Sequence, residues 1–164
     1  MRSLSLKMLV IGLGNPILTD DGVGVRVAEE VLNRLPVDTP IEVTEVSVGG
    51  LTLMESMIGY DRVILIDALQ LHDSHPGTIH RMSLDDLREI SATQHSASPH
   101  DTTLVTALEM GQKIGLKLPE EVIIFAIEVE NVMDFSEELT PAVAAALPEA
   151  TEAVLQEISS MSQS

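Results

Sequence analysis

The 164-residue chain contains no cysteine. Disulfide bonds, thiolate metal ligands and a cysteine nucleophile are therefore excluded. Aromatic residues are also scarce, at 2% of the chain, whereas hydrophobic residues make up 45%. A core of this composition has to be built from Val, Ile, Leu, Met and Ala. The length is typical of one domain, so we expect residues 1–164 to form a single domain.

Basic residues are few, with 9 Lys and Arg against 26 Asp and Glu, which gives a formal net charge of −17. A surface this acidic repels phosphate backbones, so we do not expect the chain to bind nucleic acid. The same charge is compatible with a metal ion or with a basic protein partner.

Long apolar runs are missing as well, so we expect no membrane-spanning segment. The first eight residues contain two bases but neither an apolar run nor a small-residue cleavage site, which argues against a secretory signal. We therefore expect a cytoplasmic protein. Because no apolar stripe is left unexplained by the core, a monomer is the expected state.

The most informative stretch runs from Met8 to Val25. An apolar run, Met8 to Ile11, is typical of a buried strand, and Gly12-Leu-Gly14-Asn-Pro16 then favours a sharp turn. Two adjacent acids, Asp20 and Asp21, precede Val23, Val27, Val31 and Leu35, whose spacing predicts a helix from Asp20 or Asp21 to Leu35. Ligand sites of open α/β sheets lie at such strand-to-helix junctions.

Strands and helices alternate along the rest of the chain. We predict strands at 41–48, 62–68, 78–82 and 122–127, and helices at 51–58, at 85–90, from Asp101 or Thr102 to 114, and from Pro141 onward with Thr140 as its cap. A slip in the apolar alternation of 41–48 suggests a β-bulge, and Leu51, Met54 and Ile58 are expected to form the buried face of helix 51–58. The pattern predicts a single three-layer α/β domain, with a mainly parallel twisted sheet of about five strands and helices on both faces.

Three side chains are candidates for a common site. Asp21 and Asp67 each follow an apolar strand, and His100 lies in a predicted loop before a helix. Right-handed crossovers bring all three positions to one edge of a parallel sheet. Two carboxylates and one imidazole suit a borderline divalent metal, and three protein ligands leave coordination positions open for chemistry.

The motifs along the chain resemble those of the [NiFe]-hydrogenase maturation endopeptidases. The long first motif matches that family's signature, and shorter matches follow in order through nearly the whole chain. They are Gly12-Leu-Gly-Asn-Pro-Ile-Leu-Thr-Asp-Asp-Gly-Val-Gly24, Gly49-Gly50, Leu65-Ile-Asp67-Ala68, Gly77-Thr78, Ser98-Pro-His100 and Leu139-Thr-Pro141.

The resemblance implies that Asp21, Asp67 and His100 form both the metal-binding and the catalytic site. The first acid is often Glu in that family, and Asp20 is the adjacent candidate. The implied activity removes the C-terminal extension of a [NiFe]-hydrogenase large-subunit precursor after nickel insertion. Nickel arrives with the precursor, and no organic cofactor is implied. Either the metal polarises the scissile carbonyl or activates water, or Asp21 or Asp67 is the general base; we expect metal-assisted hydrolysis.

Three other functions are considered. A dinucleotide-binding protein needs Gly-x-Gly-x-x-Gly, but Ile17 stands at the third glycine. Peptidyl-tRNA hydrolases share the Gly-Leu-Gly-Asn-Pro turn, yet they need an Arg-His-Asn run and a basic surface that this chain lacks. A protein that senses nickel and binds the precursor without cleaving it is the third alternative.

Several polar residues have simpler interpretations. Asp20 is expected to be a helix cap, and Asn15 either bonds to its own turn or positions a substrate. Solvated side chains or surface charges are expected at His72, His75, His80, His95, Glu128 and Glu130.

Overall fold

The computed structural model describes residues 6–92 and 99–162, and it describes side chains in 6–90 and 104–162. Strands and helices alternate along most of the chain, as predicted. The strands are β1 (Met8–Leu13), β2 (Glu42–Val46), β3 (Arg62–Leu69), β4 (Ile79–Ser83) and β5 (Glu121–Glu128). A 3₁₀ turn, η1 (Thr19–Gly22), precedes the helices α1 (Val23–Arg34), α2 (Gly50–Met57), α3 (Leu84–Ala92), α4 (Pro99–Lys113) and α5 (Pro141–Ser162).

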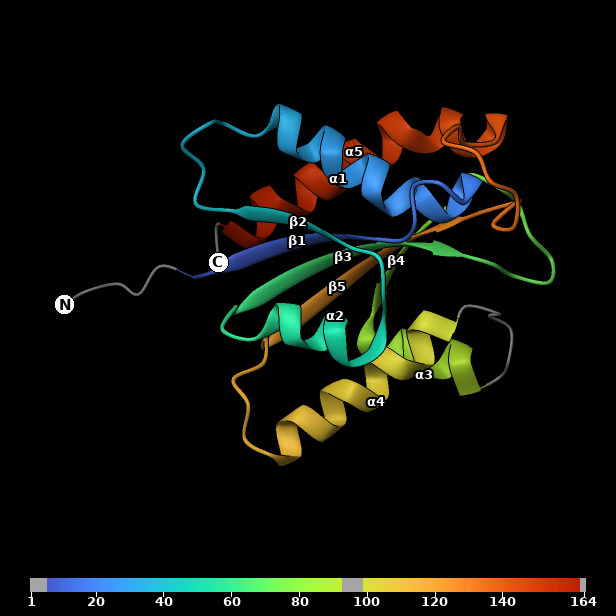
Figure 1. The fold of residues 1–164 in the computed structure, drawn as a ribbon. Helices are drawn as coiled ribbons and strands as arrows, with labels where there is room; N and C mark the ends of the chain where they lie inside the picture. The colour runs from blue at the N-terminus through green and yellow to red at the C-terminus, as the bar shows by residue number, and fades with distance from the viewer. Residues whose placement is uncertain (1–5, 93–98, 163–164) are drawn as a thin grey trace.

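The strands form one sheet in the order β2-β1-β3-β5-β4. The first four in this order are parallel, and β4 pairs antiparallel with β5. Helices α1 and α5 cover one face, and α2, α3 and α4 cover the other (Figure 1). The predicted single α/β domain with helices on both faces is therefore confirmed. In the described part of the chain, no helix combines the length and apolar character needed to cross a membrane.

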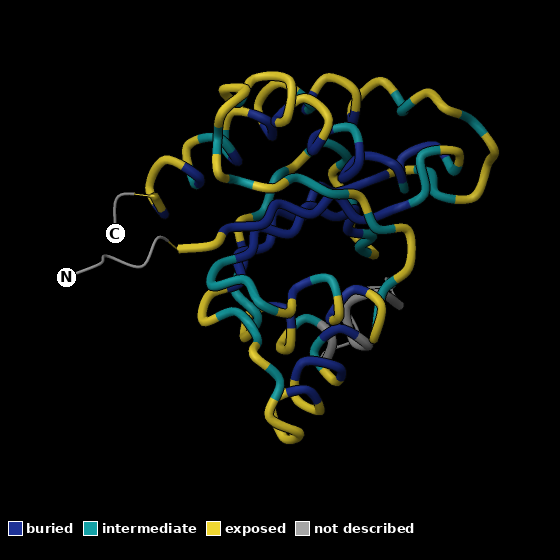
Figure 2. The backbone as a smooth tube through the Cα atoms, turned by 60° about the vertical axis from the view of Figure 1, so that its left-hand side comes forward, coloured by how far each residue is buried: buried dark blue, intermediate teal, exposed yellow. Residues whose placement is uncertain are grey.

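The central strands are the most deeply buried part of the molecule (Figure 2). Every residue of β1, and all but the first of β3 and β5, is buried, as their continuous apolar runs predict. Edge strand β2 is only partly buried. Its pairing with β1 runs without a break from Leu9↔Glu42 to Leu13↔Val46, so the bulge predicted there is wrong.

The faces and starts of several helices differ from prediction. Helix α1 begins at Val23, because the preceding acids form the separate 3₁₀ turn η1. Helix α2 buries Leu53, Met54 and Met57, whereas Leu51 and Ile58 are exposed, so the predicted buried face was rotated. Helix α4 begins at Pro99, so Asp101 and Thr102 lie inside the helix and do not cap it.

Candidate functional site

The turn after β1 brings the two adjacent acids to the carboxyl edge of the sheet. Gly14 has φ +141°, and a Cβ there would lie 1.9 Å from the backbone oxygen of Asp21. A Cβ on Gly24 would lie 2.3 Å from the carbonyl oxygen of Ile66 and 2.6 Å from that of Leu13. Only glycine allows these contacts, so the glycines press η1 and the start of α1 against the ends of β1 and β3.

Asp20 is completely buried and holds the loop that joins β5 to α5. Its Oδ2 accepts hydrogen bonds from the backbone N–H groups of Glu130 (3.0 Å) and Asn131 (3.1 Å) and from the hydroxyl of Thr140 (2.7 Å). Its Oδ1 accepts from the backbone N–H of Thr140 at 2.8 Å. Asp20 makes no side-chain cap to its own helix, so the predicted cap is wrong. Its carboxylate instead anchors a segment more than a hundred residues away.

Asp21 lies in the same 3₁₀ turn but is only partly buried. Its Oδ2 accepts the backbone N–H of Asn15 at 2.8 Å. The Asn15 side chain in turn accepts the N–H of Ile17 at 3.2 Å, so it bonds to its own turn, as one of the two interpretations predicted. Of the adjacent acids, Asp20 is enclosed by donors and Asp21 reaches the solvent-facing side of the edge. The burial therefore separates two residues that helical periodicity left equivalent.

Asp67 lies near the end of β3, the strand next to β1, and is 4% exposed. Its Oδ1 accepts the backbone N–H of Ala68 at 2.8 Å. The neighbouring strand positions Leu65 and Leu69 pack with α2, α3 and α4, so strand alternation places Asp67 on that same face. Asp21 follows β1 in the turn η1, which packs against β3. Because β1 and β3 are adjacent and parallel, Asp21 and Asp67 both lie at the carboxyl edge of the sheet.

His100 lies in the first turn of α4, not in a loop before it, and its side chain is outside the described residues. The chain beyond α4 reaches the amino edge of the sheet, where the carbonyl of Lys117 accepts the N–H of Gly59. The first turn of α4 therefore points toward the carboxyl edge (Figure 1). Among side chains that the structure describes, no three His, Cys, Asp or Glu residues gather to hold a metal ion. The predicted triad, which includes His100, stays a prediction.

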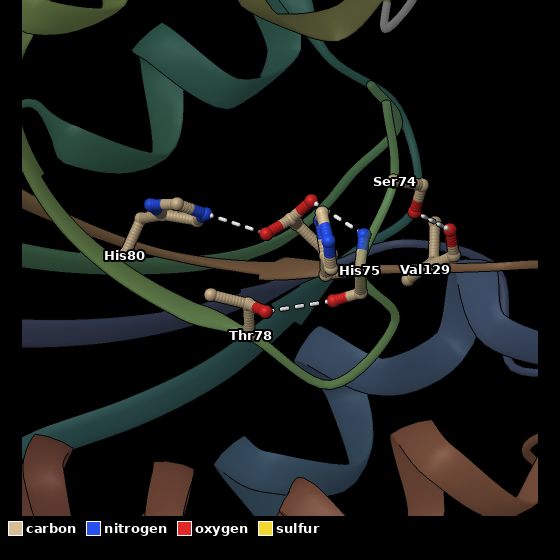
Figure 3. Close-up of polar contacts among 6 residues, drawn as sticks. Ser74, His75, Thr78, His80 and Val129 are labelled. Carbon is tan, nitrogen blue, oxygen red and sulfur yellow. Dashed lines mark hydrogen bonds and ion pairs between the residues drawn. The ribbon is translucent and has the colours of Figure 1, made fainter. Parts of the chain in front are cut away.

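A third buried acid, Glu128, lies at the end of β5 and is 3% exposed. Its Oε1 accepts the backbone N–H of His75 at 3.0 Å, and its Oε2 lies 2.9 Å from Nε2 of His80 (Figure 3). The prediction of a surface charge at Glu128 was therefore wrong, because β4 returns antiparallel and places His80 over the end of β5. His80 keeps a solvent-exposed side chain, as predicted, but it also contacts Glu128. His72, His75 and Glu130 are exposed, as expected, and His95 lies outside the described residues.

Burial by itself raises the pKa of Glu128. The backbone N–H of His75 and the side chains of His80 and Thr78 stabilise the carboxylate more, so the pKa of Glu128 lies below its ordinary value. The sequence did not indicate that Glu128 is buried, because an acid at the end of an apolar strand has the same sequence pattern whether or not a partner covers it. The register of β4 against β5 supplies the partner.

Comparison with known proteins decides which family has this architecture. A family model described as hydrogenase maturation protease matches residues 25–157. The chain belongs to the hydrogenase maturation protease family. The hydrogenase 2 maturation protease of Escherichia coli K12 is 29% identical over 150 residues, which cover 92% of this chain and 89% of that protein. The solved structure of the E. coli hydrogenase maturating endopeptidase HybD matches with a TM-score of 0.80 and 27% identity, covering 95% of this chain and 94% of that one.

The fold extends to more distant members of the same family. The Thermococcus kodakarensis [NiFe] hydrogenase maturation protease HybD matches with a TM-score of 0.73 at 21% identity, covering 92% of this chain and 98% of that one. Membership of the maturation proteases confirms the resemblance seen in the motifs, and it makes this chain a hydrolase of the protease class. The glycines after β1 allow the turn η1 and helix α1 to pack closely against the sheet. In a dinucleotide-binding protein, the glycines of this turn would instead contact the pyrophosphate.

Proposed function

We propose that this maturation protease removes the C-terminal extension of a [NiFe]-hydrogenase large-subunit precursor after nickel has been inserted. The observation that supports this proposal best is that Asp21 and Asp67 both lie at the carboxyl edge of the sheet, after the adjacent parallel strand β1 and near the end of β3. Asp20 fixes the turn that presents Asp21, and the backbone N–H of Ala68 orients Asp67. Carboxylates held in this way can contact a metal or a scissile peptide that another protein presents.

The chemistry of the donors fits a metal carried by the substrate. The chain has no cysteine, so it offers nickel no thiolate ligand, and the soft ligands must come from the precursor. Asp21 and Asp67 supply two carboxylates, and His100 is the proposed third ligand from the first turn of α4. An incomplete site of this kind favours a precursor that already holds its nickel.

Two roles are open to the carboxylates once the precursor is bound. Nickel brought by the precursor would supply Lewis-acid polarisation of the scissile carbonyl or of a water molecule. Asp21 and Asp67 would then orient the cleavage site, and the carboxylate nearer the attacking water would accept its proton. We favour metal-assisted hydrolysis, in which substitution of either carboxylate by its amide weakens both metal contact and proton transfer.

The test is incubation with a purified, nickel-loaded large-subunit precursor followed by mass measurement of the product. We expect one cut near the precursor's C-terminus, with metal-free precursor left intact. Asp21→Asn, Asp67→Asn and His100→Ala should each slow cleavage by about 100-fold or more, as expected when a group active in the transition state is removed. Asp38→Asn, an exposed acid beyond α1, is the matched control and should cleave at the normal rate.

Normal cleavage by Asp67→Asn and His100→Ala would contradict metal-assisted hydrolysis at this edge. Cleavage of metal-free precursor at the same rate would contradict the dependence on nickel. Tight binding of the nickel-loaded precursor without any cut would contradict the protease proposal and favour a nickel-sensing protein.

A further inference from the structure

An exposed apolar patch lies next to the candidate site, made of Ile17, Met133 and Phe135. The chain has only two phenylalanines. Phe125 lies buried in β5, but Phe135 is 83% exposed, and Met133 is almost as exposed. Leaving an aromatic ring in water forgoes the stabilisation that burial would give, so its position calls for an explanation.

Ile17 and Phe135 are direct neighbours, although they lie far apart in the sequence. Leu18 and Ser136 form a parallel bridge. Within it, the N–H of Ser136 donates to the carbonyl of Ile17, and the N–H of Thr19 donates to the carbonyl of Ser136, both at 2.9 Å. Ile17 and Phe135 each precede the bridge by one residue, so they share a register position beside it.

The segment that presents these side chains is tightly held. Asp20 bonds to its beginning and to its end, and the carbonyl of Asp134 accepts the hydroxyl of Thr19 at 2.5 Å. The side chain of Asn131 accepts the N–H groups of Met133 and Asp134, which closes a tight turn. A partner that binds here pays little to order the loop, because the loop is already ordered.

The rim of the patch is acidic. Four exposed carboxylates surround it in the sequence: Glu130, Asp134, Glu137 and Glu138. No Lys or Arg follows Lys117 anywhere in the sequence, and the nearby Arg26 donates to the carbonyl of Glu137. An apolar centre with an acidic rim fits a partner that brings an apolar side chain flanked by Lys or Arg.

We propose that the loop of residues 129–140, together with Ile17, is the docking surface for a basic and apolar segment of the hydrogenase large-subunit precursor. This inference rests on the function proposed above. Residues Ile17, Thr19 and Asp20 lead directly into Asp21, and Figure 1 shows the loop before α5 beside the segment that follows β1. A precursor seated on Ile17 and Phe135 therefore lies beside the carboxylates that face the scissile bond.

Two strongly exposed apolar residues elsewhere lack these features. Ile114 is 75% exposed and Val37 is fully exposed, but they follow α4 and α1, at the amino edge of the sheet. Single apolar residues on a surface are ordinary and need no partner. Ile114 is therefore a matched control for Phe135, with similar exposure and a position away from the site.

The test measures kcat and KM for cleavage of the nickel-loaded precursor. Phe135→Ala and Met133→Ala should each raise KM about tenfold, in the range of an interface hot spot, while kcat stays within about twofold. Ile114→Ala should leave both constants unchanged. The double variant Glu137→Lys/Glu138→Lys should raise KM by about fivefold at low salt and less at high salt, because the lost attraction is screened.

Thermal unfolding of each variant separates loss of docking from loss of folding, and the exposed rim variant provides a second test if Phe135→Ala unfolds. Unchanged KM in both Phe135→Ala and the rim variant would overturn the docking surface and leave the protease proposal intact. Failure of the unaltered protein to cleave the nickel-loaded precursor would overturn the proposed function, and the docking inference with it. A fall in kcat at unchanged KM would also overturn docking, because it would place Phe135 in the chemistry.

Discussion

Asp20 and Glu128, two of the buried carboxylates at the carboxyl edge, hold their loops with different donors. Asp20 accepts only neutral groups, namely three backbone N–H groups and one hydroxyl, all from the segment that leads to α5. Glu128 accepts a backbone N–H and also pairs with His80, whose side chain is 38% exposed. The Asp20 corner is a closed cage of fixed donors, whereas the Glu128 corner includes an ionisable partner in contact with solvent.

The difference teaches what each corner can do. A carboxylate bound by many backbone donors fixes a loop rigidly, because no donor can leave without leaving a buried group unpaired. The Asp20 corner therefore suits the support of Asp21 and of the docking loop. The Glu128 site joins β4 to β5 through a carboxylate and an imidazole on neighbouring strands.

The largest effect is expected from Asp20→Asn. One side-chain oxygen becomes an NH₂ donor that faces N–H and O–H donors in a closed site, so we expect a loss of about 2–4 kcal/mol of unfolding free energy. Asp21→Asn is the control, with the same chemical change one residue away, and it should cost less than about 1 kcal/mol because the amide oxygen can still accept the Asn15 N–H. Urea unfolding at pH 7 measures both. Equal losses would contradict the closed cage at Asp20.

A smaller effect is expected from Glu128→Gln, about 1–2 kcal/mol. The amide oxygen can keep the bond from the His75 N–H, and the amide NH₂ can donate to a ring nitrogen of His80, so this site adapts where the Asp20 site does not. Glu130→Gln, an exposed acid two residues away, should change stability by less than about 0.5 kcal/mol. A loss at Glu128 that matches Asp20→Asn would remove the distinction between the two corners.

The smallest effect is the pH dependence of the Glu128 corner. Because the folded-state pKa of Glu128 lies below its ordinary value of 4.5, its ionisation stabilises the fold above pH 4.5. That contribution disappears as pH falls through the lowered pKa. The difference in unfolding free energy between the unaltered protein and Glu128→Gln should therefore be constant near neutral pH and shrink below pH 4.5. Urea midpoints measured from pH 7 to pH 3 check this, and a difference that grows on acidification would contradict the lowered pKa.

Much of the fold is predictable from the sequence because buried parallel strands need continuous apolar runs. The runs at β1, β3 and β5 have no other stable position than the centre of a covered sheet. Shorter elements were placed less well. Helix α2 contains apolar residues on several sides, so its composition could not indicate which of them would face the core. The start of α4 was missed because Pro99 is equally compatible with a loop and with the first turn of a helix.

Part of the candidate site was likewise predictable from the sequence, and part of it was not. The motif spacing brought Asp21 and Asp67 to one edge, and the structure places both there. The roles of Asp20, Thr140, Glu128 and His80 were out of reach, because each depends on a partner distant in sequence. The local sequence cannot indicate which of two adjacent acids, Asp20 or Asp21, is buried and which is accessible.

The sequence by itself determined the α/β class, the parallel centre of the sheet, the absence of thiol chemistry and the family to which the chain belongs. These follow from local patterns, from composition and from motifs in a fixed order. Only the tertiary structure decided that Asp20 anchors a distant loop, that Glu128 is buried against His80, and that Ile17 meets Phe135 beside Asp21. Those contacts join segments far apart along the chain, and their free energy exists only once the sheet has brought the segments together.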